Sequence, residues 1–245
     1  MNIFLIRVNR YVITAMMVWA VLGCRSYATE PTNAIPPVAT VSQASEVDAQ
    51  TRCQNLAQSE KDHTYIYVVN GLDPLFLGKL NGFCKSIRCV GYKNVELVSM
   101  RRCGRIEDKI CCIRQNDPRA KIVIAGYSWG ANRARAICNS LNNRSVPVDL
   151  LVYIGGDMVG DREYSRPPNA ARILNLNGHG LVLLGRDMFF NGEDISGATN
   201  YRLDVPHLGL PRRQETLDLF LAAVADTTEK APAVAENNSL MAQTP

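Results

Sequence analysis

The chain has 245 residues, of which 47% are hydrophobic and 20% charged, a balance typical of a soluble globular protein. This length is enough for one domain with a sizeable core, whereas two domains would each be small. The formal net charge is +4, and two of the positive charges, Arg7 and Arg10, lie in a segment that we expect to be removed, which leaves about +2. This balance argues against the basic surface of a nucleic-acid-binding protein, so we expect no nucleic-acid partner.

Residues 1–23 have the pattern of an export signal. Arg7 and Arg10 precede the apolar stretch 11–23, YVITAMMVWAVLG, which is too short to span a bilayer comfortably. The stretch closes as VLGC and resembles a bacterial lipoprotein signal, which implies that Cys24 is acylated and becomes the new N-terminus. We therefore expect a protein of the bacterial cell envelope, attached to the membrane through lipidated Cys24, with its domain in the periplasm or outside the cell. Ordinary signal cleavage after Ala28, a retained anchor and a cytosolic protein are the alternatives.

The segments on either side of the core lack hydrophobic periodicity. Residues 29–60 are rich in Pro, Thr, Ser, Ala and Gln, which predicts a flexible linker over 24–61. The pattern is lost again after Asp226, so residues 227–245 are predicted to form a disordered tail. The folded domain is therefore expected at 62–226.

Within this domain, β-rich apolar runs alternate with helical patterns. The runs predict strands at 64–71, 94–100, 121–126, 148–156 and 170–178, and helices at 73–91, 105–116, 131–143 and 214–226. Asp73 and Pro74 look like the N-cap and first residue of the first of these helices. Alternation of this kind predicts an α/β fold with a mainly parallel sheet and helices on both faces.

The sequence GYSWG places Ser128 between Gly126 and Gly130. A G-x-S-x-G pattern is weak by itself, but here a buried strand ends at Gly126 and a helix begins after Gly130. This is the context of a nucleophile elbow, in which small residues let strand and helix approach closely while the serine stands above the sheet edge. We therefore predict that Ser128 is a nucleophile; a purely structural turn is the alternative.

These residues resemble the α/β-hydrolase superfamily, and more narrowly its small exported lipase- and esterase-like bacterial members. The resemblance covers about 64–226 and rests on NGLDP at 70–74, GYSWG at 126–130, and GATN at 197–200 followed by His207. It implies the α/β-hydrolase fold with a minimal core and little or no lid, since only 158–169 and 179–200 are long enough to act as one. It also implies a catalytic triad in the order Ser, acid, His, and no metal or organic cofactor.

The acid of this triad is predicted to be Asp157, which follows the strand 148–156 directly. The carboxyl ends of strands are where an open α/β sheet gathers its functional residues. The carboxylate would orient the histidine and stabilise its charge. In many members of the superfamily the acid follows the next strand instead, so other candidates stay open: Asp161, Asp187, Asp194 and Asp204.

The base is predicted to be His207, which precedes the last helix, where the superfamily supplies its histidine. The chain has only three histidines. His63 precedes the first core strand and is expected at the wrong edge of the sheet, whereas His179, in NGHG, is the main rival.

The resemblance also implies an oxyanion hole made of backbone N–H groups. One donor is expected from Trp129, the residue after the nucleophile, and the other from Leu72, with Gly71 making room. A histidine often precedes this glycine in the superfamily, and Asn70 stands there in this chain. An ordinary turn and helix cap is the alternative interpretation of NGLDP.

Together these residues predict a serine hydrolase that cleaves carboxylic esters through an acyl-enzyme. The substrate is expected to be a small acyl ester or a lipid-like ester. An acyltransferase with the same triad and a catalytically inactive binding lipoprotein are the alternatives.

The chain contains eight cysteines, which suits an exported protein. Without Cys24 an odd number remains, so at least one is free or pairs between chains. Their spacing shows no metal-binding pattern, and neither the disulfide pairing nor the oligomeric state can be read from the sequence.

Overall fold

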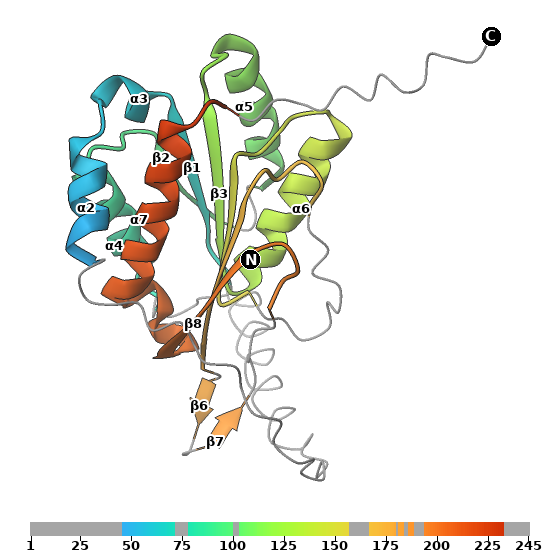
Figure 1. Ribbon diagram of the computed structural model, residues 1–245. Helices are drawn as coiled ribbons and strands as arrows, with labels where there is room; N and C mark the ends of the chain where they lie inside the picture. Colours follow the sequence, from blue (N-terminus) through green and yellow to red (C-terminus); the bar gives the residue numbers. More distant parts are fainter. Residues whose placement is uncertain are drawn as a thin grey trace, which may run out of the picture. The chain divides into compact units, whose positions relative to one another are not determined.

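The computed structural model describes residues 46–71, 78–99, 103–156, 167–179, 181–183, 186–188 and 194–232, all of which belong to one compact unit, Val38–Pro245. Helices and strands alternate along it (Figure 1). The helices are α2 (Glu46–Asn55), α3 (Gln58–Asp62), α4 (Leu80–Cys89), α5 (Cys103–Asn116), α6 (Trp129–Asn143), the 3-10 turn η3 (His207–Arg212) and α7 (Gln214–Glu229). The strands are β1 (Thr64–Val69), β2 (Val95–Val98), β3 (Lys121–Tyr127), β4 (Leu150–Ile154), β5 (Ile173–His179), β6 (Leu181–Leu183), β7 (Arg186–Met188) and β8 (Thr199–Pro206).

Six strands form one sheet in the order β2-β1-β3-β4-β5-β8, and every neighbouring pair is parallel. β6 and β7 form a separate antiparallel pair. The α/β class with a mainly parallel sheet is thereby confirmed. Because all six strands run the same way, their carboxyl ends meet at one edge of the sheet, where functional residues of such folds gather.

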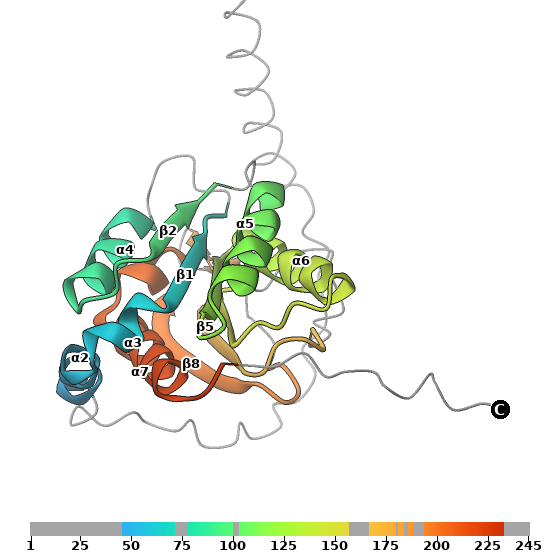
Figure 2. The same cartoon turned by 90° about the horizontal axis from the view of Figure 1, so that it is seen from above.

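Helices cover both faces of the sheet, as predicted. α2, α4 and α7 lie on one face, and α5 and α6 lie on the other (Figures 1 and 2). Two apolar cores separate these helices from the sheet, one containing Val68 and Phe220 and the other containing Ile124 and Ile137. β3 is buried along its whole length, which explains why its sequence is a continuous apolar run without alternation.

One predicted helix starts later than expected, and one strand of the sheet was not predicted. The helix expected from Asp73 begins only at Leu80, because Lys79 has a left-handed backbone with φ 47°, which a continuous helix does not allow; Asp73 and Pro74 themselves lie outside the described residues. β8 was not predicted, because this edge strand is exposed at every other position in its second half and has no apolar run.

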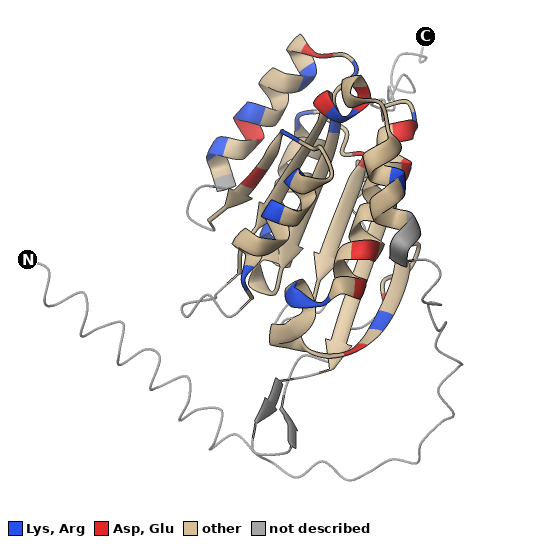
Figure 3. Ribbon diagram, turned by 90° about the vertical axis from the view of Figure 1, so that its left-hand side faces the viewer, with Lys and Arg blue, Asp and Glu red and all other residues tan. Residues whose placement is uncertain are grey.

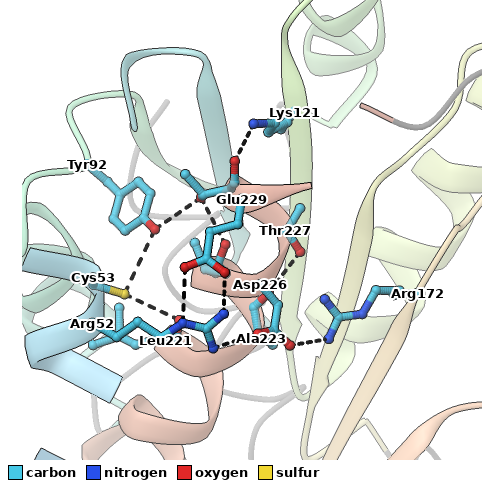
Figure 4. A network of polar contacts seen from close by, with 12 residues as sticks. Arg52, Cys53, Tyr92, Lys121, Arg172, Leu221, Ala223, Asp226, Thr227 and Glu229 are labelled. Atoms are coloured by element: carbon cyan, nitrogen blue, oxygen red, sulfur yellow. Dashed lines mark hydrogen bonds and ion pairs between the residues drawn. The ribbon is translucent and has the colours of Figure 1, made fainter. Parts of the chain in front are cut away.

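The predicted linker 24–61 is wrong for its last part, since residues 46–62 form α2 and α3. Apolar residues recur at helical spacing here: Ala49 and Cys53 in α2, and Leu56 directly after it. Ala49 and Cys53 are buried in the core. Figure 4 shows how α2 is held against α7: Arg52 lies 2.5 Å from Glu229 and 2.7 Å from Asp226. The folded part therefore begins well before residue 62.

The end of the domain also lies beyond the predicted boundary at 226. α7 continues to Glu229, and Thr227 and Thr228 are buried. The Thr228 carbonyl accepts a hydrogen bond from Lys121, and its hydroxyl is 3.1 Å from the Tyr92 hydroxyl. The remainder of the predicted tail, 233–245, lies outside the described residues, as do the signal segment and Cys24.

A buried ion pair ties the start of β3 to α5, and its removal should destabilise the fold. Asp149 accepts hydrogen bonds from the Ile122 N–H at 2.6 Å and from Arg114 at 2.5 Å, and the side chains of the pair are only 6% and 11% exposed. Asp149→Ala would leave the Arg114 charge buried without this carboxylate. We expect a loss of about 3 kcal/mol or more in unfolding free energy, measured by urea denaturation.

Glu96→Ala is the matched control. Glu96 pairs with Lys109 at 2.6 Å, but both side chains are about half exposed, at 45% and 55%. Exposed pairs contribute little because water screens them. Equal losses in the two variants would contradict the structural role assigned to Asp149.

Candidate active site

Ser128 occupies the sharp turn between β3 and α6. Its backbone has φ 55° and ψ −129°, a conformation that residues other than glycine adopt rarely and at a cost in energy. Its N–H donates to the Ile154 carbonyl at 3.0 Å, and its own carbonyl accepts from the Ala131 N–H at 2.8 Å. The predicted strand–turn–helix context is therefore present, with the serine at its turn.

The two glycines that flank Ser128 are required by close backbone contacts. A Cβ on Gly126 would lie 2.3 Å from the Gly130 carbonyl oxygen, and a Cβ on Gly130 would lie 2.2 Å from the Val69 carbonyl oxygen. Both distances are well inside van der Waals contact. The absence of side chains at 126 and 130 lets α6 start directly against β3 and β1.

Gly71 lies beside the same turn, two residues after the end of β1. A Cβ there would be 2.5 Å from the Tyr127 carbonyl oxygen, 2.9 Å from the Trp129 nitrogen and 3.0 Å from the Ser128 Cβ. Glycine thus lets the backbone after β1 pass close to the backbone of the serine turn, next to the amide of Trp129, the predicted oxyanion-hole donor. Leu72, the expected second donor, lies outside the described residues.

His207 lies at the same edge of the sheet, as the first residue of η3 directly after β8. A Cβ on Gly155, at the end of β4, would be 2.7 Å from the His207 Nδ1, so the imidazole rests against the backbone of Gly155. Tyr127 and Ile154 are partners in the register of β3 and β4, which makes Ser128 and Gly155 the next positions on neighbouring strands. The fold therefore brings His207 to the serine turn.

Two contacts of His207 were not predicted from the sequence. The ring stacks on Tyr127 with a centroid distance of 5.4 Å and an interplanar angle of 24°, and the Tyr127 hydroxyl donates to the His207 carbonyl at 3.3 Å. Gly155 has φ +58°, a left-handed conformation suited to glycine, and leaves room for the ring. Two features of the sequence could have indicated these contacts: Tyr127 directly precedes Ser128, and the glycines Gly155 and Gly156 follow a buried strand.

Of the other two histidines, one lies at the opposite edge of the sheet and one at the same edge as Ser128. His63 is at the amino end of β1, the opposite edge of the sheet, as predicted. Its Nδ1 lies 2.6 Å from Asp117. His179, the rival base, ends β5 opposite Pro206, and its Nε2 contacts the exposed carboxylate of Asp204, itself a rival acid.

The acid of the predicted triad stays a prediction. Asp157 and Asp161 lie outside the described residues, and for Asp187 only the backbone, in β7, is described. Asp194, another rival, lies 3.3 Å from Arg202 and is exposed. The two segments considered as a lid, 158–169 and 179–200, fall partly outside the described residues, at 158–166, 180, 184–185 and 189–193.

His207 is only 4% exposed, and burial lowers its pKa from the usual 6.5 to about 4. At neutral pH the ring is uncharged in both the folded and the unfolded state. As the pH falls below 6.5, the unfolded chain takes up a proton that the folded protein takes up only near pH 4, so the folded state loses stability. Between pH 7 and pH 4 this should reduce the unfolding free energy by about 3 kcal/mol, measured by denaturation at each pH.

His207→Gln removes this titration and leaves the other groups in place. The difference in unfolding free energy between wild type and variant should therefore change by the same amount over this pH window. A constant difference would mean that the folded protein holds His207 at an ordinary pKa.

Within the described ranges, no cluster of three or more His, Cys, Asp or Glu side chains could hold a metal ion. In the same residues, no helix is both long and apolar enough to cross a membrane. Six cysteines of this part of the chain are free thiols: Cys53, Cys84, Cys89, Cys111, Cys112 and Cys138.

No protein-family model and no curated protein matches this chain. Solved structures with a similar arrangement include an α/β serine hydrolase from Xanthomonas campestris described as lacking a lid, with 14% identity, TM-score 0.48, and 70% of this chain and 85% of that chain covered. A predicted CIB-like hydrolase from Thermoplasma acidophilum has 13% identity, TM-score 0.46, and coverage of 70% and 89%.

A thioesterase from the prodiginine biosynthetic pathway of Streptomyces coelicolor has 12% identity to this chain and a TM-score of 0.44, with 68% of this chain and 86% of that chain covered. Because the identities and scores are this low, the likenesses do not identify what this protein acts on. Its function has to be inferred from its own residues.

Proposed function

We propose that this protein is a serine hydrolase that cleaves carboxylic esters through Ser128, His207 and Asp157. The observation that carries the proposal is the strained turn at Ser128, held beside a buried histidine that rests on the next strand. Backbone strain in a well-packed turn persists where a function requires it. A serine on such a turn needs a base to become a nucleophile, and His207 is in place for that role.

The orientation of His207 suits a triad. Its Nδ1 faces Gly155, and Asp157 follows Gly155 by two residues in the chain. A carboxylate at Asp157 would accept the Nδ1–H and leave Nε2 for the Ser128 hydroxyl. Its negative charge would also stabilise the imidazolium that forms when His207 takes the serine proton.

The reaction then proceeds in two steps. Ser128 Oγ attacks the ester carbonyl while His207 takes the hydroxyl proton and gives it to the leaving alkoxide, which departs as an alcohol. Water, deprotonated by the same histidine, attacks the acyl-enzyme and releases the carboxylic acid. The amide of Trp129, with that of Leu72, would stabilise the oxyanion in both steps.

We also propose a cellular location and a membrane attachment for this protein. The signal segment predicts export, and lipidated Cys24 would anchor the domain to the membrane of the cell envelope. A small acyl ester or a lipid-like ester is the proposed substrate class.

Hydrolysis of p-nitrophenyl esters of increasing chain length tests this function. The purified protein should release p-nitrophenol, and His207→Ala should reduce the rate to background. Labelling with a fluorophosphonate followed by mass spectrometry should place the adduct on Ser128. A protein that neither hydrolyses the esters nor reacts with the probe would overturn the proposal.

Asp157→Asn tests the acid. Without the carboxylate, kcat/KM should fall by roughly 10⁴-fold, as expected when the histidine loses its orienting partner. The acidic limb of the pH–rate profile should move to lower pH, because the pKa of His207 falls when the negative charge is removed. Asp161→Asn is the matched control and should leave both properties nearly unchanged; the reverse pattern would transfer the role to Asp161.

A further inference from the structure

A cavity of about 280 Å³ opens between α4, the end of η3 and the start of α7. Ser128 and His207 are not among the residues that line it. The lining residues are Lys79, Gly82, Phe83, Ser86, Pro211, Arg212, Arg213, Gln214 and Leu217. It is large enough for a small organic ligand.

The rim of this cavity is strongly basic. Three of its lining residues are cations, Lys79 before α4 and Arg212 and Arg213 at the junction of η3 with α7, where Figure 3 shows basic residues in blue. In the part of the chain that the structure describes, no carboxylate forms an ion pair with any of the three. Glu215, in the first turn of α7, does not line the cavity. Asp218, one turn further along, is buried and accepts hydrogen bonds from Gln214 and Gln50.

The backbone adds to this positive charge. Lys79 and Arg213 are the N-cap residues of α4 and α7, helices of 10 and 16 residues, and neither end is capped by a side-chain hydrogen bond. The first N–H groups of each helix have no intrahelical acceptor, and the amino end of a helix favours negative charge. The start of α4 has no acidic residue in its first turn and therefore adds to the charge of the three side chains, whereas Glu215 in the first turn of α7 offsets part of the positive charge there.

The walls below the rim are apolar. Phe83 and Leu217 are 4% and 8% exposed, and Phe83 is braced by an edge-on contact with Phe220 at 5.1 Å. A ligand that matches this cavity has a negative head and a compact apolar group. Three cations favour a dianion over a single carboxylate, because each unmatched positive charge would repel the others.

We propose that this cavity binds a phosphomonoester with a small apolar substituent. The phosphate would lie among Lys79, Arg212 and Arg213, and the substituent would pack on Phe83 and Leu217. Guanidinium groups suit this role because they pair with phosphate through two parallel hydrogen bonds. The site does not depend on the proposed hydrolase activity.

Titration calorimetry with phenyl phosphate tests the proposal. We expect a Kd on the order of 0.1–1 mM at low salt, weakening as salt is added. The double variant Arg212→Gln, Arg213→Gln should weaken binding at least tenfold, whereas Lys230→Gln, which removes a cation at the far end of α7, should not. Circular dichroism and thermal melting establish that both variants are folded.

Further ligands and variants separate the outcomes. Benzoate should bind at least fivefold more weakly than phenyl phosphate, and Ser128→Ala should bind phenyl phosphate as wild type does. Phosphatidylcholine vesicles with and without phosphatidic acid distinguish a lipid source of the phosphomonoester from a soluble one. The proposal is overturned if neither phenyl phosphate nor phosphatidic acid binds, if benzoate binds equally well, or if the double variant retains full affinity.

Discussion

Replacing Ser128 with alanine should lower kcat/KM for a p-nitrophenyl ester by on the order of 10³- to 10⁶-fold, since the nucleophile and the covalent intermediate are both lost. Only an oxygen atom is removed, and the strained backbone at φ 55° is the same for either residue. The unfolding free energy should therefore change little. Initial rates with purified protein and urea denaturation measure the two quantities separately.

Ser128→Gly extends this prediction to the strain itself. Glycine adopts the φ 55°, ψ −129° conformation without steric conflict, so this variant should be inactive but more stable than Ser128→Ala by about 1–3 kcal/mol. If the glycine variant is inactive and more stable, the strained backbone at Ser128 lowers the stability of the fold while it holds the hydroxyl in position. Full activity in either variant would remove Ser128 from the mechanism.

The central strands could be predicted because burial on both faces leaves a direct mark on the sequence. β3 and β4 are buried at every position and read as continuous apolar runs. β8 carries no such mark: as an edge strand it pairs with β5 alone, and its residues are half polar. Its position depends on pairing with β5, where Thr199 lies opposite Leu174, and local patterns do not encode a pairing over this distance in the chain.

The extent of the domain was underestimated for a related reason. α2 is polar on most of its surface and buries only a narrow side, Ala49 and Cys53, against α7. A helix of this kind forms because of its tertiary contacts rather than its own propensity. Arg52 completes the contact with Asp226 and Glu229, which lie more than 170 residues further along the chain.

The residues of the candidate site also differ in whether a local sequence pattern can predict them. The turn at Ser128 is local, so Gly126, Ser128 and Gly130 were readable together as one short motif. The stacking of His207 on Tyr127 joins residues 80 positions apart and required β8 and η3 to be in place. The identity of the acid depends on the loop after β4, and Asp157 therefore stays a prediction.

Gly130→Ala should strongly destabilise the fold. Its Cβ would lie 2.2 Å from the Val69 carbonyl oxygen and 2.9 Å from the Asn70 carbonyl carbon, and both are backbone atoms that cannot rotate away. α6 would have to move off β1, which also disturbs the turn at Ser128. We expect a loss of about 3 kcal/mol or more, a fall in Tm of about 10 °C, and loss of ester hydrolysis.

Gly104→Ala is the matched control, because Gly104 lies in α5 and a Cβ there would meet no atom within 4 Å. Alanine is the better helix former, so this variant should be unchanged or more stable by up to about 1 kcal/mol. If the unfolding free energy falls in Gly130→Ala but not in Gly104→Ala, the loss comes from the close approach of α6 to β1 and not from replacing a glycine as such. If Gly130→Ala has the same Tm as wild type, α6 is free to shift at the serine turn. In that case the close packing of α6 on β1 does not maintain the strained conformation of Ser128.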